Sequence, residues 1–521
     1  MLNLLTEPLI RVRTGEGDRR VCSLPEVFSL LVRDAVAEFP ALRPHQRHPW
    51  HAFLVQVAAL ALHRAGETEP PEEEQDWAAL LRGLTPEWPE DEPWSLVAPP
   101  DRPAFMQAPI ADGDLSVFKP DLIEAPDALD MLVTSKNHDL KSEVMVGAHP
   151  DDWLFALVSL QTMEGFMGQG NYGISRMNGG FASRPAVGVL PPGASGARFL
   201  RDLRVFLRAR DKILETTDLR GEGGIGLVWL QPWAGEQQIA FRDLDPFYIE
   251  ICRRVRLQDD GDGLRAIGAT SKKARIDAAA LKGNTGDPWT PIERKEAKAL
   301  SITGEGFSYR RMTELMLGET YQRPFLQELQ RDDADEGLAI IASSVARGQG
   351  KTEGYHERIV PISNTVTKLL RRQSTDRLAA QAKERVDEAG TMRGKVLRPA
   401  LFALLQQGPE DIAYGKKTTG PQAEQWLQRF ERAVDAEFFP DLWREAEAET
   451  EEERKRIRRK WWEKLAKAAK ELLDDAARST PQSAMRRYRA QVRARDLFSR
   501  LLYSPKNFSD LKREETHDTA D

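Results

Sequence analysis

The residues best suited to contact another molecule lie in a glycine-rich stretch at 165–185. It contains six glycines, together with Gln169, Asn171, Asn178 and two arginines, Arg176 and Arg184. Glycines permit positive φ angles and a close approach of the backbone to a partner, so we expect an exposed loop. Amides and arginines can donate hydrogen bonds to phosphates or base edges. An ordinary flexible connection fits the composition equally well, because G-Q-G-N-Y-G matches no nucleotide-binding fingerprint.

A second polar segment, at 132–141, is centred on Asn137-His138-Asp139. A metal ion needs three or four ligands, and His149 is the one further histidine close by in sequence. A metal-dependent nuclease site is therefore an alternative. A loop that hydrogen-bonds to a phosphodiester backbone or a base edge, and a plain structural turn, are the other interpretations.

Residues 347–354 form a second glycine-rich turn with amide and basic groups. It contains Gly-Lys-Thr but lacks the earlier glycine that a phosphate-binding P-loop requires. The sequence also lacks the zinc-protease, serine-hydrolase and EF-hand patterns. We therefore predict no enzyme, no catalytic residue, no cofactor and no bound metal.

The net charge of −7 argues against a chain that coats nucleic acid non-specifically. Basic residues are nevertheless concentrated at 454–470 and 486–500, where they can form local binding faces. The ordinary interpretation of such runs is a solvated helix face. Trp461 and Trp462 lie within the first run, and we expect one indole in the core while the other is free to stack or dock a partner.

No apolar run is long enough to span a bilayer, and Cys22 and Cys252 make no disulfide framework. These features predict a cytoplasmic protein with no membrane partner.

At 521 residues the chain is longer than one ordinary hydrophobic core accommodates. The elements that must position these loops show two different sequence patterns. Strand and helix patterns mix up to residue 362, and nearly everything beyond is helical with few glycines. We predict an α+β fold, with a large mixed α/β N-terminal domain at 1–362, a C-terminal antiparallel helix bundle at 363–505 and a polar tail at 506–521.

Local patterns place the loops between particular elements. Ser23, followed by Pro25 and Glu26, predicts the start of a helix. A helix at 153–167 leads into the glycine-rich stretch, and a helix over 325–346 is expected to lead into the second glycine turn.

Four features occur in an order that resembles one family. They are the start from Leu4 to Val12, the segment from Arg102 to Gln107, the Asn137-His138-Asp139 loop and the glycine-rich stretch. Together they resemble the CasA family, the large subunits of the type I-E CRISPR RNA-guided surveillance complex, Cascade. The order of features covers almost the whole chain.

The resemblance implies a non-enzymatic subunit in antiviral defence. Such a subunit recognises the protospacer-adjacent motif of double-stranded DNA from the minor groove, opens the duplex to start R-loop formation and helps recruit a helicase–nuclease. The implied partners are double-stranded target DNA, the 5′ handle of the guide RNA, other Cascade subunits and the helicase–nuclease.

The resemblance also implies roles for individual residues. The motif-reading glycine loop corresponds to Gly168, Gln169, Gly170 and Asn171. A lysine finger corresponds to Lys272 or Lys273, and a wedge to Gln349 with Gly348 and Gly350 beside it. The guide-RNA handle loop corresponds to Lys136, Asn137, His138, Asp139 and Lys141.

Some family members carry a cysteine cluster that can bind zinc. This chain has only Cys22 and Cys252, so we expect no such site here.

Two alternatives stay open beside this resemblance. One is a metal-dependent nuclease that uses His138 and Asp139, with His149. The other is a scaffold subunit whose basic helices bind acidic partners without any DNA contact.

Overall fold

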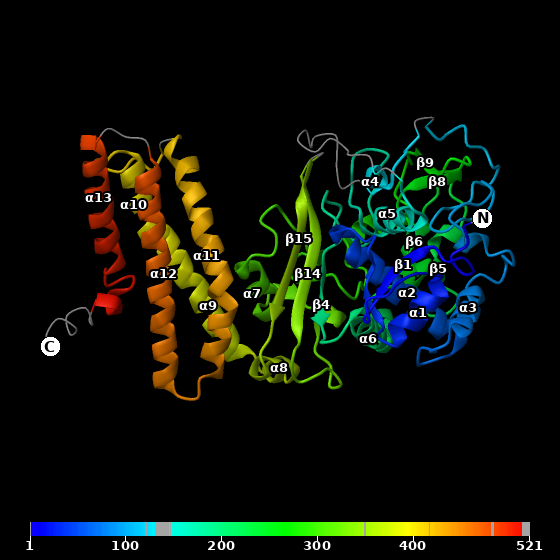
Figure 1. Cartoon of the computed structure of the whole chain (residues 1–521), viewed down its shortest axis with the longest axis horizontal. Coiled ribbons are helices and arrows are strands. Elements are labelled where there is room, and N and C mark those ends of the chain that lie inside the picture. Colours follow the sequence, from blue (N-terminus) through cyan, green and yellow to red (C-terminus); the bar gives the residue numbers. More distant parts are fainter. Residues whose placement is uncertain are drawn as a thin grey trace. The chain divides into compact units, whose positions relative to one another are not determined.

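A computed structural model describes residues 2–119, 122–130, 145, 147–348, 351–415, 417–480 and 484–512. The chain divides into two compact units. The first comprises Met1–Phe307 and Glu319–Ile362, and the second comprises Ser308–Gly318 and Ser363–Asp521. The first unit mixes helices with strands and the second is helical, which confirms the predicted α+β class (Figure 1).

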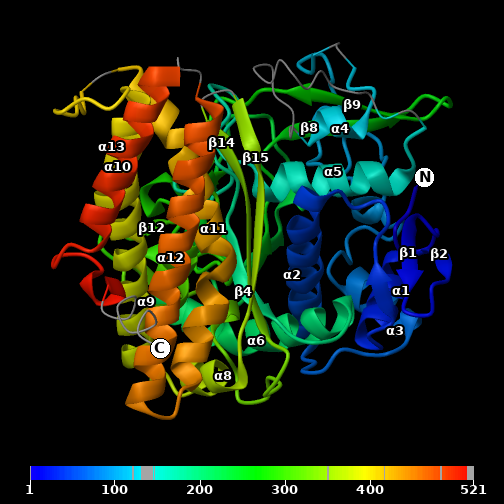
Figure 2. The same cartoon turned by 60° about the vertical axis from the view of Figure 1, so that its left-hand side comes forward.

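The first unit is built around helix α2 (Arg47–Ala65), in which every residue from Ala52 to Leu62 is buried. A helix that is buried on all sides needs neighbours all round it. Three helices pack against α2: α3 (Glu74–Gly83), α5 (Pro150–Met163) and α6 (Ser195–Thr216) (Figure 2). The helix predicted at 153–167 is therefore present as α5, and it ends before the glycine-rich stretch begins.

Helix α1 (Leu24–Val32) packs on α3 and α6. It begins as the sequence predicts, because the Ser23 hydroxyl accepts a hydrogen bond from the Glu26 N–H at 3.1 Å. This contact satisfies one of the free N–H groups of the first turn. A further short helix, α4, spans Pro126–Leu129.

The strands form six small sheets in the described part of the first unit. The three-stranded sheets have the orders β2-β1-β3, β12-β11-β13 and β15-β14-β4, and the two-stranded pairs are β10-β6, β5-β7 and β8-β9. The strands are β1 (Ile10–Thr14), β2 (Arg19–Cys22), β3 (Val36–Glu38), β4 (Ala186–Leu190), β5 (Ile225–Leu227), β6 (Ile239–Ala240), β7 (Leu244–Ile249), β8 (Arg254–Asp259), β9 (Leu264–Ala269), β10 (Ile276–Asp277), β11 (Ile292–Glu293), β12 (Lys298–Ala299), β13 (Tyr321–Gln322), β14 (Ala339–Gly348) and β15 (Lys351–Pro361).

The prediction of a helix over 325–346 is wrong. Residues 339–348 form strand β14, which pairs antiparallel with both β15 and β4. Both faces of β14 are buried from Ala339 to Arg347, so its sequence lacks the alternation that marks a half-buried strand. A short apolar run of this kind cannot be told from a helix by periodicity alone. Gly348 therefore ends a long strand, and Lys351 begins the strand paired with it.

The second unit is a helical bundle in which long helices such as α11 and α12 lie side by side (Figure 2). Its helices are α7 (Tyr309–Leu317), α8 (Asn364–Arg371), α9 (Asp376–Thr391), α10 (Arg398–Leu405), α11 (Thr419–Glu447), α12 (Glu451–Ser479) and α13 (Ala484–Leu502), with a π-helical turn at Met392–Leu397 that joins α9 to α10. Trp461 is buried within this bundle, with its ring edge-on to Phe438 at 6.0 Å.

Helix α7 lies far from the other bundle helices in sequence. The Tyr309 ring nevertheless lies 4.7 Å from Phe438, and the Tyr309 N–H donates to Asp435. None of the helices in the described ranges is long and apolar enough to cross a membrane.

Candidate nucleic-acid interface

The glycine-rich stretch begins with a tight turn, which we call the glycine turn (residues 168–171). The N–H of Asn171 donates to the Gly168 carbonyl at 3.0 Å, and the N–H of Met167 donates to the Asn171 carbonyl at 2.9 Å. Gly170, the third residue of the turn, has a φ of +85°, which is typical of a type II turn and favours glycine. Gln169 is exposed at the tip.

The two arms of this loop are too close for side chains to fit between them. A Cβ on Gly173 would lie 2.5 Å from the carbonyl carbon of Gly165. The buried Arg253 donates to the Gly165 carbonyl at 3.1 Å and also to the Tyr172 carbonyl, one on each arm. These contacts brace a stretch whose composition suggests flexibility. The expectation of an exposed loop is wrong for most of it, because only Gln169 and Gly179 of residues 165–185 are exposed.

The turn that carries the candidate lysine finger lies directly against the glycine turn. The N–H of Ser271 donates to the Gly170 carbonyl at 3.0 Å, and a Cβ on Gly170 would lie 2.8 Å from the Cβ of Thr270. The Lys272 N–H donates to the Gly235 carbonyl at 2.8 Å, which fixes the other side of this turn. The structure thus brings together two candidate segments that are 101 residues apart.

The two lysines of this turn differ in their surroundings. Lys272 Nζ lies 2.5 Å from Glu236 Oε1, and this hydrogen bond lowers the pKa of Glu236. Both side chains are largely exposed, so the pair contributes little to stability. Lys273 is exposed, and no ion pair reaches it from the described residues. Beside them, Arg254 donates to the Thr270 carbonyl and lies 5.2 Å from the Phe118 ring.

The hairpin end at Gly348 is connected to the base of the glycine turn through two buried charges. Arg347 Nη2 lies 2.7 Å from Glu164 Oε1, and the two side chains are 1% and 5% exposed. Burial raises the pKa of Glu164, although Arg347 and Arg253 oppose the shift. The neighbouring Gln349 and Gly350 lie outside the described residues.

The candidate guide-RNA loop also lies outside the described residues. This loop carries Lys136, Asn137, His138, Asp139 and Lys141. His149 is described, and it precedes α5. The carboxylates that follow it, Asp151 and Asp152, both pair with Arg11, at 2.7 and 2.9 Å.

The described ranges contain no group of three or more His, Cys, Asp or Glu side chains placed to hold a metal ion. Both cysteines are free and buried, and burial raises the pKa of Cys252 to about 11.

Sequence reasoning missed the three charged residues that support these turns, namely Glu164, Arg253 and Arg347. Charged side chains are almost never fully buried unless they are paired, so none was expected in an interior position. One signal was available: Glu164 and Arg347 each directly precede a glycine segment.

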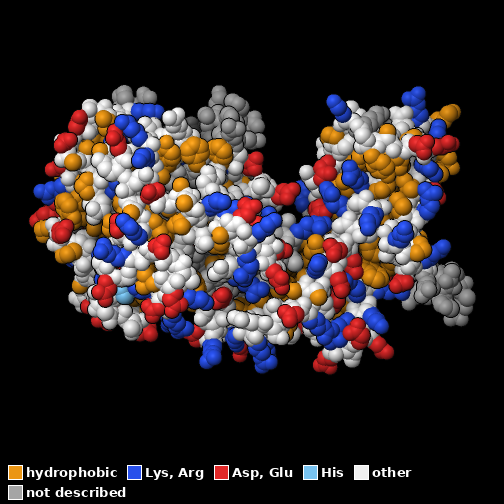
Figure 3. Space-filling model, turned by 180° about the vertical axis from the view of Figure 1, so that it is seen from behind, with side chains coloured by type: hydrophobic (Ala, Val, Ile, Leu, Met, Phe, Trp, Pro, Cys, Tyr) orange, Lys and Arg blue, Asp and Glu red, His pale blue; other side chains and the backbone are white. Residues whose placement is uncertain are grey.

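The basic run at 454–470 is partly neutralised within the second unit. Arg458 pairs with Glu384, Glu388 and Glu445, and Lys464 pairs with Glu437 and Asp441. Lys455, Lys460, Lys467 and Lys470 remain exposed. On the face shown in Figure 3, Lys and Arg side chains are interspersed with Asp and Glu, so this face has no continuous basic field.

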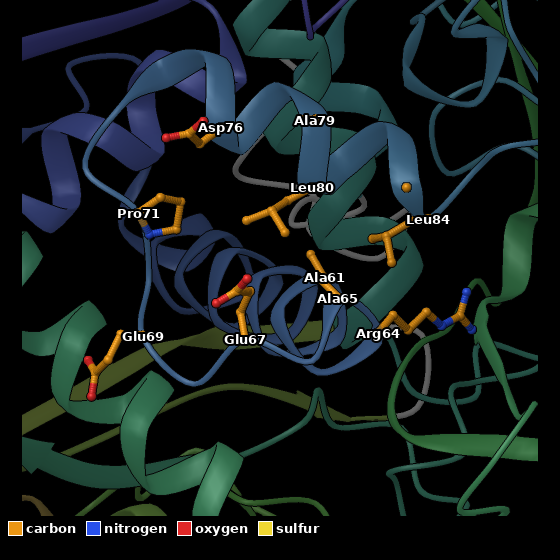
Figure 4. Close-up of a pocket in the computed structure, with 11 residues that line it drawn as sticks. Ala61, Arg64, Ala65, Glu67, Glu69, Pro71, Asp76, Ala79, Leu80 and Leu84 are labelled. Atoms are coloured by element: carbon orange, nitrogen blue, oxygen red, sulfur yellow. The ribbon is translucent and has the colours of Figure 1, made fainter.

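A separate pocket of about 600 Å³ lies between the C-terminal part of α2, helix α3 and the segment that joins them. Leu80 points into it from α3, and the Glu67 carboxylate faces it from the joining segment (Figure 4). Glu69 and Asp76 also line it, while Arg64 donates to the Gly224 carbonyl. Three carboxylates would repel phosphate, so we do not include this pocket in the candidate nucleic-acid interface.

A family model described as CRISPR-associated protein Cse1 (CRISPR_cse1) matches residues 3–497. No sequence among the curated proteins matches the chain. Three solved structures have the same fold: CasA of Thermus thermophilus (17% identity, TM-score 0.65, covering 96% of this chain and 99% of that one), Cse1 of Thermobifida fusca (16%, 0.65, 96% and 97%) and Cse1 of Acidimicrobium ferrooxidans (18%, 0.61, 96% and 97%).

Proposed function

The chain belongs to the family of CRISPR-associated protein Cse1 (CasA), the large subunit of type I-E Cascade, and we propose that it reads the protospacer-adjacent motif and opens the target duplex. The observation that carries this proposal is the shared surface of the glycine turn and the Lys272–Lys273 turn, joined by the hydrogen bond from Ser271 to Gly170. In this proposal the chain binds and deforms DNA and catalyses no reaction.

A narrow, braced turn suits the minor groove. That groove is about 6 Å wide and presents a degenerate pattern of hydrogen-bonding groups. The glycine turn has little side-chain bulk on either side of Gln169, so its backbone can approach base edges closely. A reader of this kind tolerates several related motifs and leaves full sequence specificity to the guide.

The neighbouring lysines add affinity for phosphate. Lys273 is exposed without an ion pair from the described residues, and Lys272 can exchange Glu236 for a phosphate. Each neutralised phosphate releases counterions, so this part of the binding weakens as salt rises.

Duplex opening is assigned to the hairpin end of β14 and β15, with Gln349 as the wedge. Separating one base step costs a few kcal/mol. Guide pairing then replaces the DNA duplex at nearly balanced free energy, so a small local opening decides whether pairing starts. We assign the 5′ handle of the guide RNA to the loop around His138. As a Cascade subunit the chain has other Cascade subunits as partners, and we assign contacts with them and with the helicase–nuclease to the second unit.

The test is a gel-shift series with the assembled complex on duplexes that differ only in the flanking motif. We expect binding to depend on the motif, and Gln349→Ala to slow R-loop formation while assembly stays intact. Equal binding to all motifs would favour the scaffold alternative. DNA cleavage by the isolated chain with magnesium or manganese, lost in His138→Ala, would favour the nuclease alternative.

A further inference from the structure

We propose that Glu164 and Arg347 are positioning residues that set the spacing between the glycine turn and the β14–β15 hairpin end, so that motif recognition is coupled to strand opening. This inference rests on the proposed function of the two segments. It concerns how they act together, which their separate assignments leave open.

The Glu164–Arg347 ion pair lies between the two segments. The partners are 183 residues apart, and each stands directly before its glycine segment, Glu164 before Gly165 and Arg347 before Gly348. Arg347 Nη1 also donates to the Thr352 hydroxyl on the opposite strand, at 3.2 Å. The guanidinium therefore joins the base of the glycine turn to both strands of the hairpin.

A second connection attaches the far end of the glycine-rich stretch to the same part of β14. The Ser183 N–H donates to the Val345 carbonyl at 3.1 Å, and the Val345 N–H donates to the Ser183 hydroxyl at 2.7 Å. The two ends of the glycine-rich stretch are therefore bonded to the last four residues of β14: Glu164 pairs with Arg347, and Ser183 hydrogen-bonds to Val345. A displacement of the turn by DNA would be transmitted to the hairpin.

The pair is better suited to fixing geometry than to stabilising the fold. Burying two charges carries a large desolvation penalty, and a hydrophobic replacement of similar volume is often neutral or stabilising. Glu164 Oε2 is buried and has no hydrogen-bond partner among the described residues, so the arrangement is not optimal for stability. The register of β14 and β15 shifts between Ala346 and Arg347, and such irregularities re-aim side chains.

The experiment uses the assembled complex and a target duplex with 2-aminopurine at the first base pair beside the motif. Opening is followed by fluorescence for wild type, Glu164→Leu, Arg347→Met and the double variant, and Tm is measured in parallel. We expect the double variant to regain the wild-type Tm but to open the cognate target about tenfold more slowly, within the range of measured coupling energies. On a target whose first base pairs are mismatched, it should match the wild type.

Two further variants separate positioning from folding. Glu164→Gln keeps an acceptor for Arg347, so its opening rate should stay within about twofold of wild type. Arg210→Met removes another buried arginine of the same unit, paired with Asp245 at 2.8 Å, and should lower Tm without changing the rate on cognate relative to mismatched targets.

The outcomes are distinct for the two claims. If the double variant regains both Tm and wild-type opening, or if Glu164→Gln opens as slowly as Glu164→Leu, the positioning role is refuted. If wild-type opening does not depend on the motif at all, the proposed function itself fails, whatever the variants do.

Discussion

The backbone N–H of Ser271 donates to the carbonyl oxygen of Gly170 at 3.0 Å. This bond joins two turns that are 101 residues apart in sequence. The carbonyl of Gly170 faces the lysine turn, while Gln169 beside it is exposed. In the proposed function the glycine turn reads the groove, and the lysine turn beside it contacts the phosphates of the same stretch of DNA.

The first prediction separates close packing from backbone strain in the glycine turn. Gly170→Ala should weaken motif-dependent binding, because the new Cβ would meet Thr270 at 2.8 Å. Gly179→Ala is the matched control, since Gly179 has the same φ of +85° and no atom within 4 Å of the position that a methyl group would take. Gel shifts on cognate and altered motifs compare the two. Equal losses in both variants would mean that strain alone is responsible.

The second prediction concerns the charges beside the glycine turn. The Lys272→Ala/Lys273→Ala variant should bind DNA more weakly and with a shallower salt dependence, by about one unit of slope for each lost phosphate contact. Glu236→Gln should strengthen binding, because it frees Lys272 from its present partner. Titrations between low and moderate salt measure both effects. If the salt dependence of the double variant is unchanged, the lysine finger does not lie at Lys272 or Lys273.

The third prediction is a loss of stability in acid that depends on His48. Its side chain is buried, neither ring nitrogen has a hydrogen-bond partner among the described residues, and burial lowers its pKa well below 6.5, with Arg184, Arg198 and His51 adding to the shift. Below about pH 6.5 the unfolded chain binds a proton that the folded chain excludes, so stability falls as pH falls.

Thermal unfolding at pH 7.5 and pH 5.5 tests this. His48→Leu should lose less Tm over this interval than wild type, while His149→Leu, at an exposed position, should behave as wild type does. An identical loss in His48→Leu and wild type would contradict the prediction.

The fourth prediction distinguishes the two adjacent tryptophans of α12. Trp461 is 1% exposed and lies 5.0 Å from the Arg385 guanidinium, so Trp461→Ala should cost about 3–5 kcal/mol. Trp462 is half-buried and packs on Phe508 at 5.9 Å, so its replacement by Ala should cost less. Denaturant unfolding of the full chain measures both. Comparable costs would show that both indoles belong to the core.

Local signals in the sequence predicted much of the fold. Three features follow from neighbouring residues alone and can be recognised without tertiary structure. They are the helix cap at Ser23, the helix before the glycine-rich stretch and the helical sequence pattern beyond residue 362. Residues 339–348 could not be assigned in this way, because a strand buried on both faces has no alternating pattern.

The sequence by itself determined which segments lack side-chain bulk and carry amides or lysines, because composition and turn chemistry are local properties. Only the tertiary structure decided that Gly170 touches Ser271, and that Glu164 meets Arg347 across 183 residues. Such pairings arise from the tertiary arrangement of α5, β9 and β14, and no single segment encodes them. A buried charge is stable only where its partner has been brought to it, so residues of this kind become visible only in the folded chain.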